Sequence, residues 1–221
     1  MALRCDSPMV LLPGMAADER LFEPQRRAFP GLIVPSWITP ARREPLPSYA
    51  RRMAFAIRSA NPSFVGGVSF GGMVALEMAS HLGLAECVMI SSIRSPAEMP
   101  WRLRVLRPLA SIGPERLGST AGWAARWLPP FMPRVTARRL GRLAAPQSAF
   151  LRWACWAVLR WQPTPAARQV RVVQIHGSAD RTFPLRYTHP DEIVAGGGHL
   201  LTLTHPLEVN RFLDVACSSL T

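Results

Sequence analysis

Short apolar runs alternate with helix-like segments along most of this chain, and this alternation constrains the fold more than any other feature of the sequence. The runs are nearly continuous in apolar character, as in strands that are covered on both faces. The pattern therefore predicts a buried parallel sheet flanked by helices. The predicted strands are residues 9–12, 32–36, 63–68, 86–91, 170–176 and 192–195, and the predicted helices are residues 46–60, 71–82 and 207–220.

Residues 95–165 interrupt this alternation. The segment holds 10 of the 22 prolines and 6 of the 7 tryptophans, and no strand stands out in it, although residues 149–161 read as a helix. An insertion of short helices between two strands of one sheet indicates a cap over the strand ends, where ligands of such sheets bind. We therefore divide the chain into a core, residues 1–94 and 166–221, and a helical cap, residues 95–165.

The strongest local motif is Gly67-Val68-Ser69-Phe70-Gly71, which fits the pattern G-x-S-x-G. In this motif the serine lies on a sharp turn from a strand into a helix, and larger side chains two positions away would collide with neighbouring backbone. The turn also puts Ser69 beside a helix N-terminus, where negative charge is stabilised. Because an apolar strand precedes the motif and a helix follows it, a glycine-rich turn with an incidental serine is the weaker interpretation.

A nucleophilic serine needs a base, and the candidate residues are His81, His176, His189, His199 and His205. His199 is preferred because it follows three glycines after the last predicted strand, in a loop that can carry the imidazole over the strand ends. His205 is the alternative if the register of that loop differs. His176 ends a predicted strand and is interpreted as a packing histidine.

The base needs an acid that fixes its tautomer and stabilises its charged form. Asp180 directly follows the fifth predicted strand, at the edge where the serine is expected. A single aspartate in a turn often serves only the turn, but its position between nucleophile and base favours a catalytic role. Asp191 and Glu192 fit less well because they lead into the next strand.

Ser69, Asp180 and His199 follow one another in the order that is typical of α/β hydrolases. The chain resembles this family over nearly its whole length, with the cap as the variable part. Residues 11–15 (LLPGM) resemble the family's oxyanion loop, with Pro13 where the family usually has histidine. The resemblance implies that the backbone N–H groups of Met15 and Phe70 form the oxyanion hole. Gly14 is the position where we expect added bulk to disturb this loop most.

The usual antiparallel N-terminal hairpin of the family is missing, because the first predicted strand begins near residue 9. We therefore expect an α/β-hydrolase fold with a shortened sheet of about six strands, mostly or wholly parallel, flanked by helices.

The predicted function is hydrolysis of a carboxylic ester or thioester through an acyl-enzyme, with no cofactor and no metal site. Acyl transfer, C–C bond cleavage and perhydrolysis could use the same triad, and a non-catalytic binding protein is a further alternative. A serine rather than an aspartate nucleophile argues against an epoxide hydrolase or a dehalogenase.

The net charge is +12, and all 26 basic residues are arginine. The absence of lysine excludes Schiff-base and Ser-Lys chemistry. The predicted cap contains 11 arginines but only two glutamates and no aspartate. This excess favours an anionic partner near the site, namely a substrate carboxylate or phosphate, an acidic carrier protein or an anionic membrane surface. A solvated helical surface is the alternative, and no recognition motif indicates nucleic acid.

The four cysteines, at positions 5, 87, 155 and 217, are widely scattered, so we expect reduced thiols and neither a disulfide framework nor a zinc site. No apolar stretch reaches the roughly 20 residues of a membrane span, and the run near the N-terminus is shorter than the apolar centre of a signal peptide. We therefore expect a cytoplasmic protein without a transmembrane segment. The sequence does not define its oligomeric state.

Overall fold

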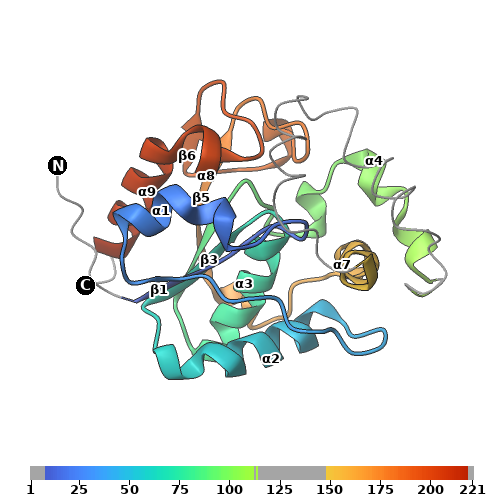
Figure 1. Ribbon diagram of the computed structural model, residues 1–221. Coiled ribbons are helices and arrows are strands. Elements are labelled where there is room, and N and C mark those ends of the chain that lie inside the picture. The colour runs from blue at the N-terminus through green and yellow to red at the C-terminus, as the bar shows by residue number, and fades with distance from the viewer. Residues whose placement is uncertain (1–7, 112, 114–147, 219–221) are drawn as a thin grey trace.

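Six parallel strands form one sheet in the computed structural model, which describes residues 8–111, 113 and 148–218 (Figure 1). The strand order is β2-β1-β3-β4-β5-β6, and all five pairings are parallel. This confirms the predicted shortened parallel sheet. The strands are β1 (Met9–Leu12), β2 (Leu32–Ile33), β3 (Phe64–Val68), β4 (Glu86–Ile90), β5 (Arg171–Gly177) and β6 (Glu192–Val194).

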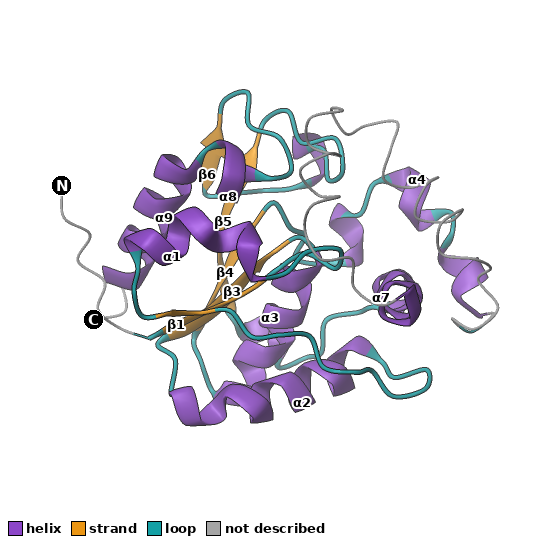
Figure 2. Ribbon diagram, viewed as in Figure 1, coloured by secondary structure: helices purple, strands orange, loops and turns teal. Residues whose placement is uncertain are grey.

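Helices cover both faces of the sheet (Figures 1 and 2). The helices α2 (Leu46–Ile57) and α3 (Phe70–Leu82) lie on one face, and α1 (Glu23–Ala28), α8 (Leu201–Thr204) and α9 (Pro206–Ser218) lie on the other. Alternate residues of a strand point to opposite faces. Val10 and Leu12 accordingly pack with α2 and α3, whereas Met9 and Leu11 pack with the helices of the other face.

The longer helices begin and end where the local sequence indicates. Helix α3 begins directly after Ser69 and ends before Gly83, whose φ of 71° suits the left-handed C-cap that glycine adopts at little cost. Helix α9 begins at Pro206, as the sequence predicts. The predicted helix 46–60 is divided into α2 and a 3-10 turn. The 3-10 turns are η1 (Glu19–Phe22), η2 (Arg58–Ala60), η3 (Pro96–Glu98), η4 (Arg107–Ser111), η6 (Ala167–Gln169) and η7 (Leu185–Tyr187).

The segment 95–165, called the insertion below, contains α4 (Trp101–Arg104) and α7 (Ser148–Arg160) besides η3 and η4. Its described residues include no strand. The division into core and cap stays a prediction, because residues 112 and 114–147 lie outside the described part of the chain.

Helix α7 packs against segments that follow the carboxyl ends of the sheet. Its Phe150 ring lies 5.5 Å from that of Trp37, which follows β2, and 6.2 Å from that of Phe70, which follows β3. Its Cys155 Sγ lies 3.7 Å from the sulfur of Met15, which follows β1. The described half of the insertion is therefore adjacent to the edge of the sheet at which the candidate site residues lie.

Buried indole groups of the insertion donate hydrogen bonds. Trp161 Nε1 donates to Glu77 Oε1 on α3 at 2.9 Å, and the same carboxylate accepts the backbone N–H of Thr164 at 3.1 Å and its hydroxyl at 2.8 Å. Glu77 is fully buried. This carboxylate thus fixes the chain to α3 where the insertion returns to the sheet.

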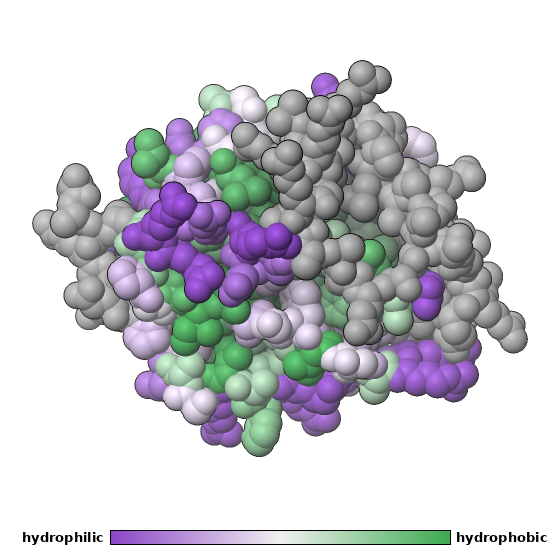
Figure 3. Space-filling model, viewed as in Figure 1, coloured by the Kyte–Doolittle hydropathy of each residue, from purple (hydrophilic) through white to green (hydrophobic). Residues whose placement is uncertain are grey.

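The exposed surface over α1 is hydrophilic in the view of Figure 3. Arg26 pairs there with Glu19 at 3.3 Å, and Arg27 pairs with Glu23. The basic charges on this face are therefore balanced locally by carboxylates.

One expectation about the cysteines is wrong. Cys217 is disulfide-bonded, whereas Cys87 and Cys155 are free. Burial raises the pKa of the Cys155 thiol to about 12, so it is not a reactive thiol. The cytoplasmic location stays a prediction.

None of the described helices is both long and apolar enough to span a membrane. Among the same residues, no group of three or more His, Cys, Asp or Glu side chains is arranged to hold a metal ion.

Candidate active site

Ser69 occupies a strained turn between β3 and α3. Its φ of 56° and ψ of −120° are unusual for a residue with a side chain. The next strand holds this turn in place, because the Ser69 N–H donates to the Ile90 carbonyl at 3.1 Å and its carbonyl accepts the Ser92 hydroxyl at 2.7 Å. These hydrogen bonds therefore hold Ser69 in a backbone conformation that a free chain would avoid.

The glycines around Ser69 are required by close backbone approach. A Cβ atom at Gly67 would lie 2.5 Å from the carbonyl carbon of Gly71, and one at Gly71 would lie 2.3 Å from the Leu12 carbonyl oxygen. These collisions explain why the motif has glycine two positions before and two positions after the serine. A Cβ at Gly14, in contrast, would meet no heavy atom within 4 Å. The expectation that bulk hurts most at Gly14 is therefore wrong on steric grounds.

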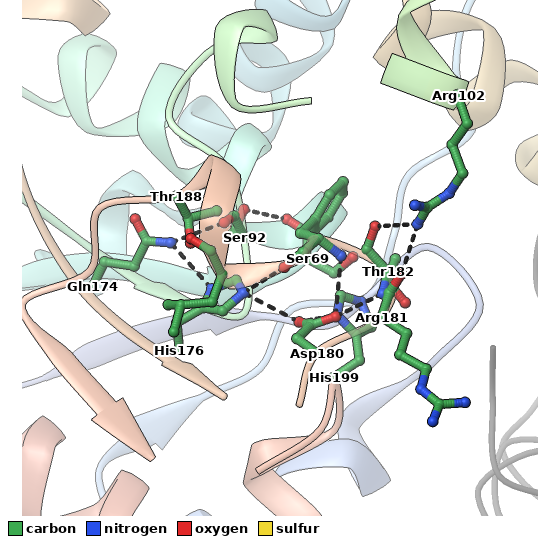
Figure 4. Close-up of polar contacts among 12 residues, drawn as sticks. Ser69, Ser92, Arg102, Gln174, His176, Asp180, Arg181, Thr182, Thr188 and His199 are labelled. Carbon is green, nitrogen blue, oxygen red and sulfur yellow. Dashed lines mark hydrogen bonds and ion pairs between the residues drawn. The ribbon is translucent and has the colours of Figure 1, made fainter. Parts of the chain in front are cut away.

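His199 and Asp180 form a hydrogen-bonded pair beside this turn (Figure 4). His199 Nδ1 lies 2.8 Å from Asp180 Oδ2, and Oδ1 accepts the backbone N–H groups of Thr182 at 2.8 Å and Phe183 at 3.0 Å. The Asp180 side chain is fully buried. Burial by itself would raise its pKa, but the charge and hydrogen bond of His199, with smaller contributions from His176 and Phe183, hold the pKa below its ordinary value. The carboxylate is thus ionised at neutral pH.

The alternative acid and base lie elsewhere. Asp191 Oδ2 accepts the Gln174 backbone N–H at 2.8 Å and pairs with Arg94 at 3.1 Å. His205 Nδ1 lies 2.9 Å from the Thr204 hydroxyl. Neither residue has a contact with the pair that His199 makes with Asp180, so the structure favours the preferred candidates over the alternatives.

Hydrogen bonds between successive segments place Ser69 and His199 at the same edge of the sheet. The Ser69 N–H donates to the Ile90 carbonyl at the end of β4, and the Ser91 N–H donates to the Ile175 carbonyl in β5 at 3.0 Å. In the loops that follow β5 and β6, the Ala179 N–H donates to the Gly197 carbonyl at 2.9 Å. Within the described chain, the Ser69 hydroxyl itself donates no hydrogen bond to His199. The structure thus joins His199 and Asp180 directly by a hydrogen bond. The hydrogen bond between a base and its nucleophile commonly shortens only when substrate binds.

The predicted oxyanion donors follow β1 and β3. The backbone N–H groups of Met15 and Phe70 donate to no acceptor within the described chain. Met15 is partly exposed, and Phe70 is the first residue of α3. Phe70 is buried, and the role of the two amides as an oxyanion hole stays a prediction.

His176 was interpreted as a packing histidine, but it contacts the candidate acid. Its Nε2 lies 2.7 Å from the Phe183 carbonyl oxygen and 3.4 Å from Asp180 Oδ2, and its Nδ1 lies 3.3 Å from Gln174 Nε2. Because a carbonyl only accepts hydrogen bonds, Nε2 carries the proton and Nδ1 accepts from Gln174. Burial lowers the pKa of His176, so the ring is neutral.

Gln174 continues this network away from Asp180. Its Nε2 also donates to the Ser92 carbonyl at 2.9 Å, and its Oε1 accepts a hydrogen bond from Arg94 Nε at 3.0 Å. Gln174 and His176 are fully buried and two residues apart on β5, so they share one face of the sheet. Two polar residues at this spacing in an otherwise apolar strand were a signal that sequence analysis could have used.

The insertion also contacts the loop that carries Asp180. Arg102 on α4 donates to the carbonyl oxygens of Arg181 at 2.6 Å and Thr182 at 3.0 Å (Figure 4). This guanidinium therefore links the insertion to the two residues that directly follow the candidate acid.

Comparison with known proteins identifies the family and supports the fold. A model of the alpha/beta hydrolase family matches residues 8–212. An esterase from Thermogutta terrifontis is similar in structure, with 19% identity, a TM-score of 0.69 and coverage of 97% of this chain and 90% of that chain. An enol-lactonase from Burkholderia xenovorans LB400 is similar with 13% identity and a TM-score of 0.68, over 96% of this chain and 92% of that chain. A carboxylesterase from Nitrososphaera gargenis is similar with 15% identity and a TM-score of 0.67, over 97% of this chain and 91% of that chain. No curated protein matches the sequence significantly.

Proposed function

The chain belongs to the alpha/beta hydrolase family, and from this premise we propose that it cleaves a carboxylic ester or thioester through an acyl-enzyme formed on Ser69. The observation that carries the proposal is the strained turn at Ser69 beside the hydrogen-bonded pair of His199 and buried Asp180. A nucleophile on such a turn, with an oriented base at the same sheet edge, is the arrangement that acyl transfer to serine requires.

In the proposed reaction, Ser69 Oγ attacks the substrate carbonyl carbon while His199 Nε2 takes the hydroxyl proton. The N–H groups of Phe70 and Met15 donate to the oxyanion of the tetrahedral intermediate. The intermediate collapses, the bond to the alcohol or thiol breaks, and His199 returns the proton to that leaving group. Water then attacks the acyl-enzyme while His199 takes a proton from it, and the second tetrahedral intermediate collapses. The bond to Ser69 Oγ breaks, His199 returns the proton to Ser69, and the acid is released.

Asp180 is proposed to orient His199 and to stabilise its charged form. Its lowered pKa keeps the carboxylate ionised, so Oδ2 can accept the Nδ1–H of the imidazole throughout the reaction. That hydrogen bond leaves Nε2 as the nitrogen that exchanges protons with the serine.

The side chains next to the proposed nucleophile favour an apolar acyl group. The Phe70 ring packs against Phe150 and Trp153 of α7, with ring centroids 6.2 and 6.0 Å apart. The arginine excess of the insertion favours, in addition, a substrate that is anionic or is attached to an acidic carrier protein. Together these features define an ester or thioester with an apolar acyl chain and a negatively charged remainder.

Hydrolysis of p-nitrophenyl esters by four purified proteins tests the proposal. We expect the wild type and His205→Ala to be active, whereas Ser69→Ala and His199→Ala lose at least about a thousandfold in kcat. His205→Ala is the matched control, because it removes a nearby histidine that does not contact Asp180. Equal activity of the wild type and Ser69→Ala would exclude the proposed nucleophile.

Product analysis separates this function from its alternatives. Acyl transfer, C–C bond cleavage and perhydrolysis would use the same serine, so the variants alone do not distinguish them. We expect the free acid as the main product in water, and an unchanged yield of acid when a competing alcohol or hydrogen peroxide is added at millimolar concentration.

A further inference from the structure

A cavity of about 630 Å³ lies away from the proposed catalytic residues. Neither Ser69, Asp180, His199 nor the oxyanion loop lines it. The volume falls within the range of small-molecule sites. The cavity is lined by residues that follow β4, by α4 and η4 of the insertion, and by the segment that leads into β5, together with Leu76 of α3.

Four of the described residues that line this cavity are arginines, and none of the described lining residues is a carboxylate. They are Arg94, Arg104, Arg107 and Arg168. Arg94 is paired with Asp191, whereas the other three form no ion pair with any carboxylate of the described chain. This differs from Arg26, Arg27 and Arg52 elsewhere on the surface, each of which has an acidic partner. A guanidinium remains charged at any physiological pH, so the cavity carries an uncompensated positive charge.

The rest of the lining is mostly small and apolar. Leu76, Pro96, Ala97, Ala167 and Val172 contribute to it, and Ser95 and Gln162 add neutral polar groups. The cavity is larger than an inorganic phosphate needs, so there is also space for an organic group against the apolar side chains. Its composition therefore suits a ligand with an anionic end and an uncharged body.

We propose that this arginine cavity binds a small organic phosphate. The planar guanidinium forms paired hydrogen bonds with phosphate oxygens, and several arginines around one site match the multiple charge of a phosphate better than the single charge of a carboxylate. The proposal does not depend on the function of Ser69.

Isothermal titration calorimetry with inorganic pyrophosphate as the probe tests the proposal, at a constant ionic strength set with sodium chloride. The variants are Arg104→Gln and Arg107→Gln, because both side chains line the cavity and neither donates a hydrogen bond within the described protein. Arg58→Gln is the matched control, since Arg58 is an exposed arginine on η2 without an ion pair and outside the cavity.

We expect saturable binding to the wild type and to Arg58→Gln, and a dissociation constant raised about tenfold or more in each cavity variant, as the loss of one charge-assisted contact implies. Acetate, which carries a single charge, should bind at least about tenfold more weakly than pyrophosphate at the same ionic strength. The proposal is overturned if pyrophosphate does not saturate, if Arg58→Gln weakens binding as much as the cavity variants, or if acetate binds equally well. Circular dichroism of each variant confirms that it is folded.

Discussion

His176 Nε2 lies 3.4 Å from Asp180 Oδ2, the same oxygen that lies 2.8 Å from His199 Nδ1. One carboxylate oxygen thus faces two imidazole N–H groups, while its other oxygen accepts two backbone N–H groups. Three N–H groups donate hydrogen bonds to the carboxylate, while the Nε2–H of His176 donates to the Phe183 carbonyl oxygen at 2.7 Å and lies beside Oδ2.

Replacing His176 with phenylalanine should therefore weaken catalysis without affecting substrate binding. We expect kcat to fall about 10- to 100-fold, the effect typical of partners that orient a reacting group, and KM to change less than about twofold. His176→Gln keeps an N–H donor close to the position of Nε2 and should recover most of kcat. Steady-state kinetics on a p-nitrophenyl ester measures both values, and equal losses in the two variants would show that only packing is involved.

The lowered pKa of His176 should make the protein less stable in mild acid. In the unfolded chain the ring takes up a proton near its ordinary pKa of 6.5, whereas in the folded chain it stays neutral to lower pH. Below about pH 6.5 the unfolded state therefore binds more protons than the folded state. As the pH is lowered, the free energy of unfolding decreases by up to about 1.4 kcal/mol per pH unit. Asp180 does not contribute to this loss of stability near pH 6, because the ordinary pKa of its carboxyl is 3.8 and the fold lowers it further.

Urea unfolding of the wild type and His176→Gln at about pH 7.5 and 5.5 measures this effect. The other ionisable groups are common to both proteins, so their contributions cancel in the comparison. The wild type should lose more stability than the variant on acidification, and parallel losses would contradict the assignment of a neutral buried His176.

Alanine at Gly71 should be harmful, whereas alanine at Gly14 should not. The added Cβ at Gly71 would lie 2.3 Å from the Leu12 carbonyl oxygen, but at Gly14 there is open space. We expect Gly71→Ala to lower the free energy of unfolding by about 1–3 kcal/mol, as overpacking does, and Gly14→Ala to change it by less than about 0.5 kcal/mol. Urea denaturation of both variants checks this, and similar stabilities would contradict the close packing around the turn.

Loss of the Glu77 carboxylate should destabilise the protein where the insertion returns to the sheet. Glu77→Ala leaves the Trp161 indole and two Thr164 donors without their acceptor. Each buried unpaired group costs about 1–3 kcal/mol, so the total loss should exceed that of Thr164→Val, which removes only one hydroxyl. A thermal or urea unfolding series of the two variants gives the comparison, and a smaller loss for Glu77→Ala would be inconsistent with these contacts.

Local patterns predicted the sheet well, because each strand depends mainly on neighbouring residues, whereas the catalytic roles of Ser69, Asp180 and His199 stay a prediction. The apolar runs define the strands, and the glycines around Ser69 reflect a backbone collision that any strand-to-helix turn of this kind must avoid. The predicted strand 32–36 was too long, since only Leu32 and Ile33 pair with β1. An edge strand has one neighbour, and its length depends on that neighbour rather than on its own composition.

Features that depend on distant residues were missed. The role of His176 follows from its contacts with Phe183 and Asp180, which come from the next loop. The disulfide of Cys217 was not foreseen, because spacing along the chain gives no distance in space. The Gly14 expectation failed for the same reason, since the space around that residue depends on segments that are remote in sequence.

Labelling with a fluorophosphonate probe, followed by intact mass measurement and peptide mapping, tests the central claim most directly. The probe reacts only with a serine that is activated as a nucleophile. We predict one probe per folded wild-type molecule, attached to Ser69, and no labelling of Ser69→Ala. An unlabelled folded wild type, or a label on another serine such as Ser92, would contradict the account.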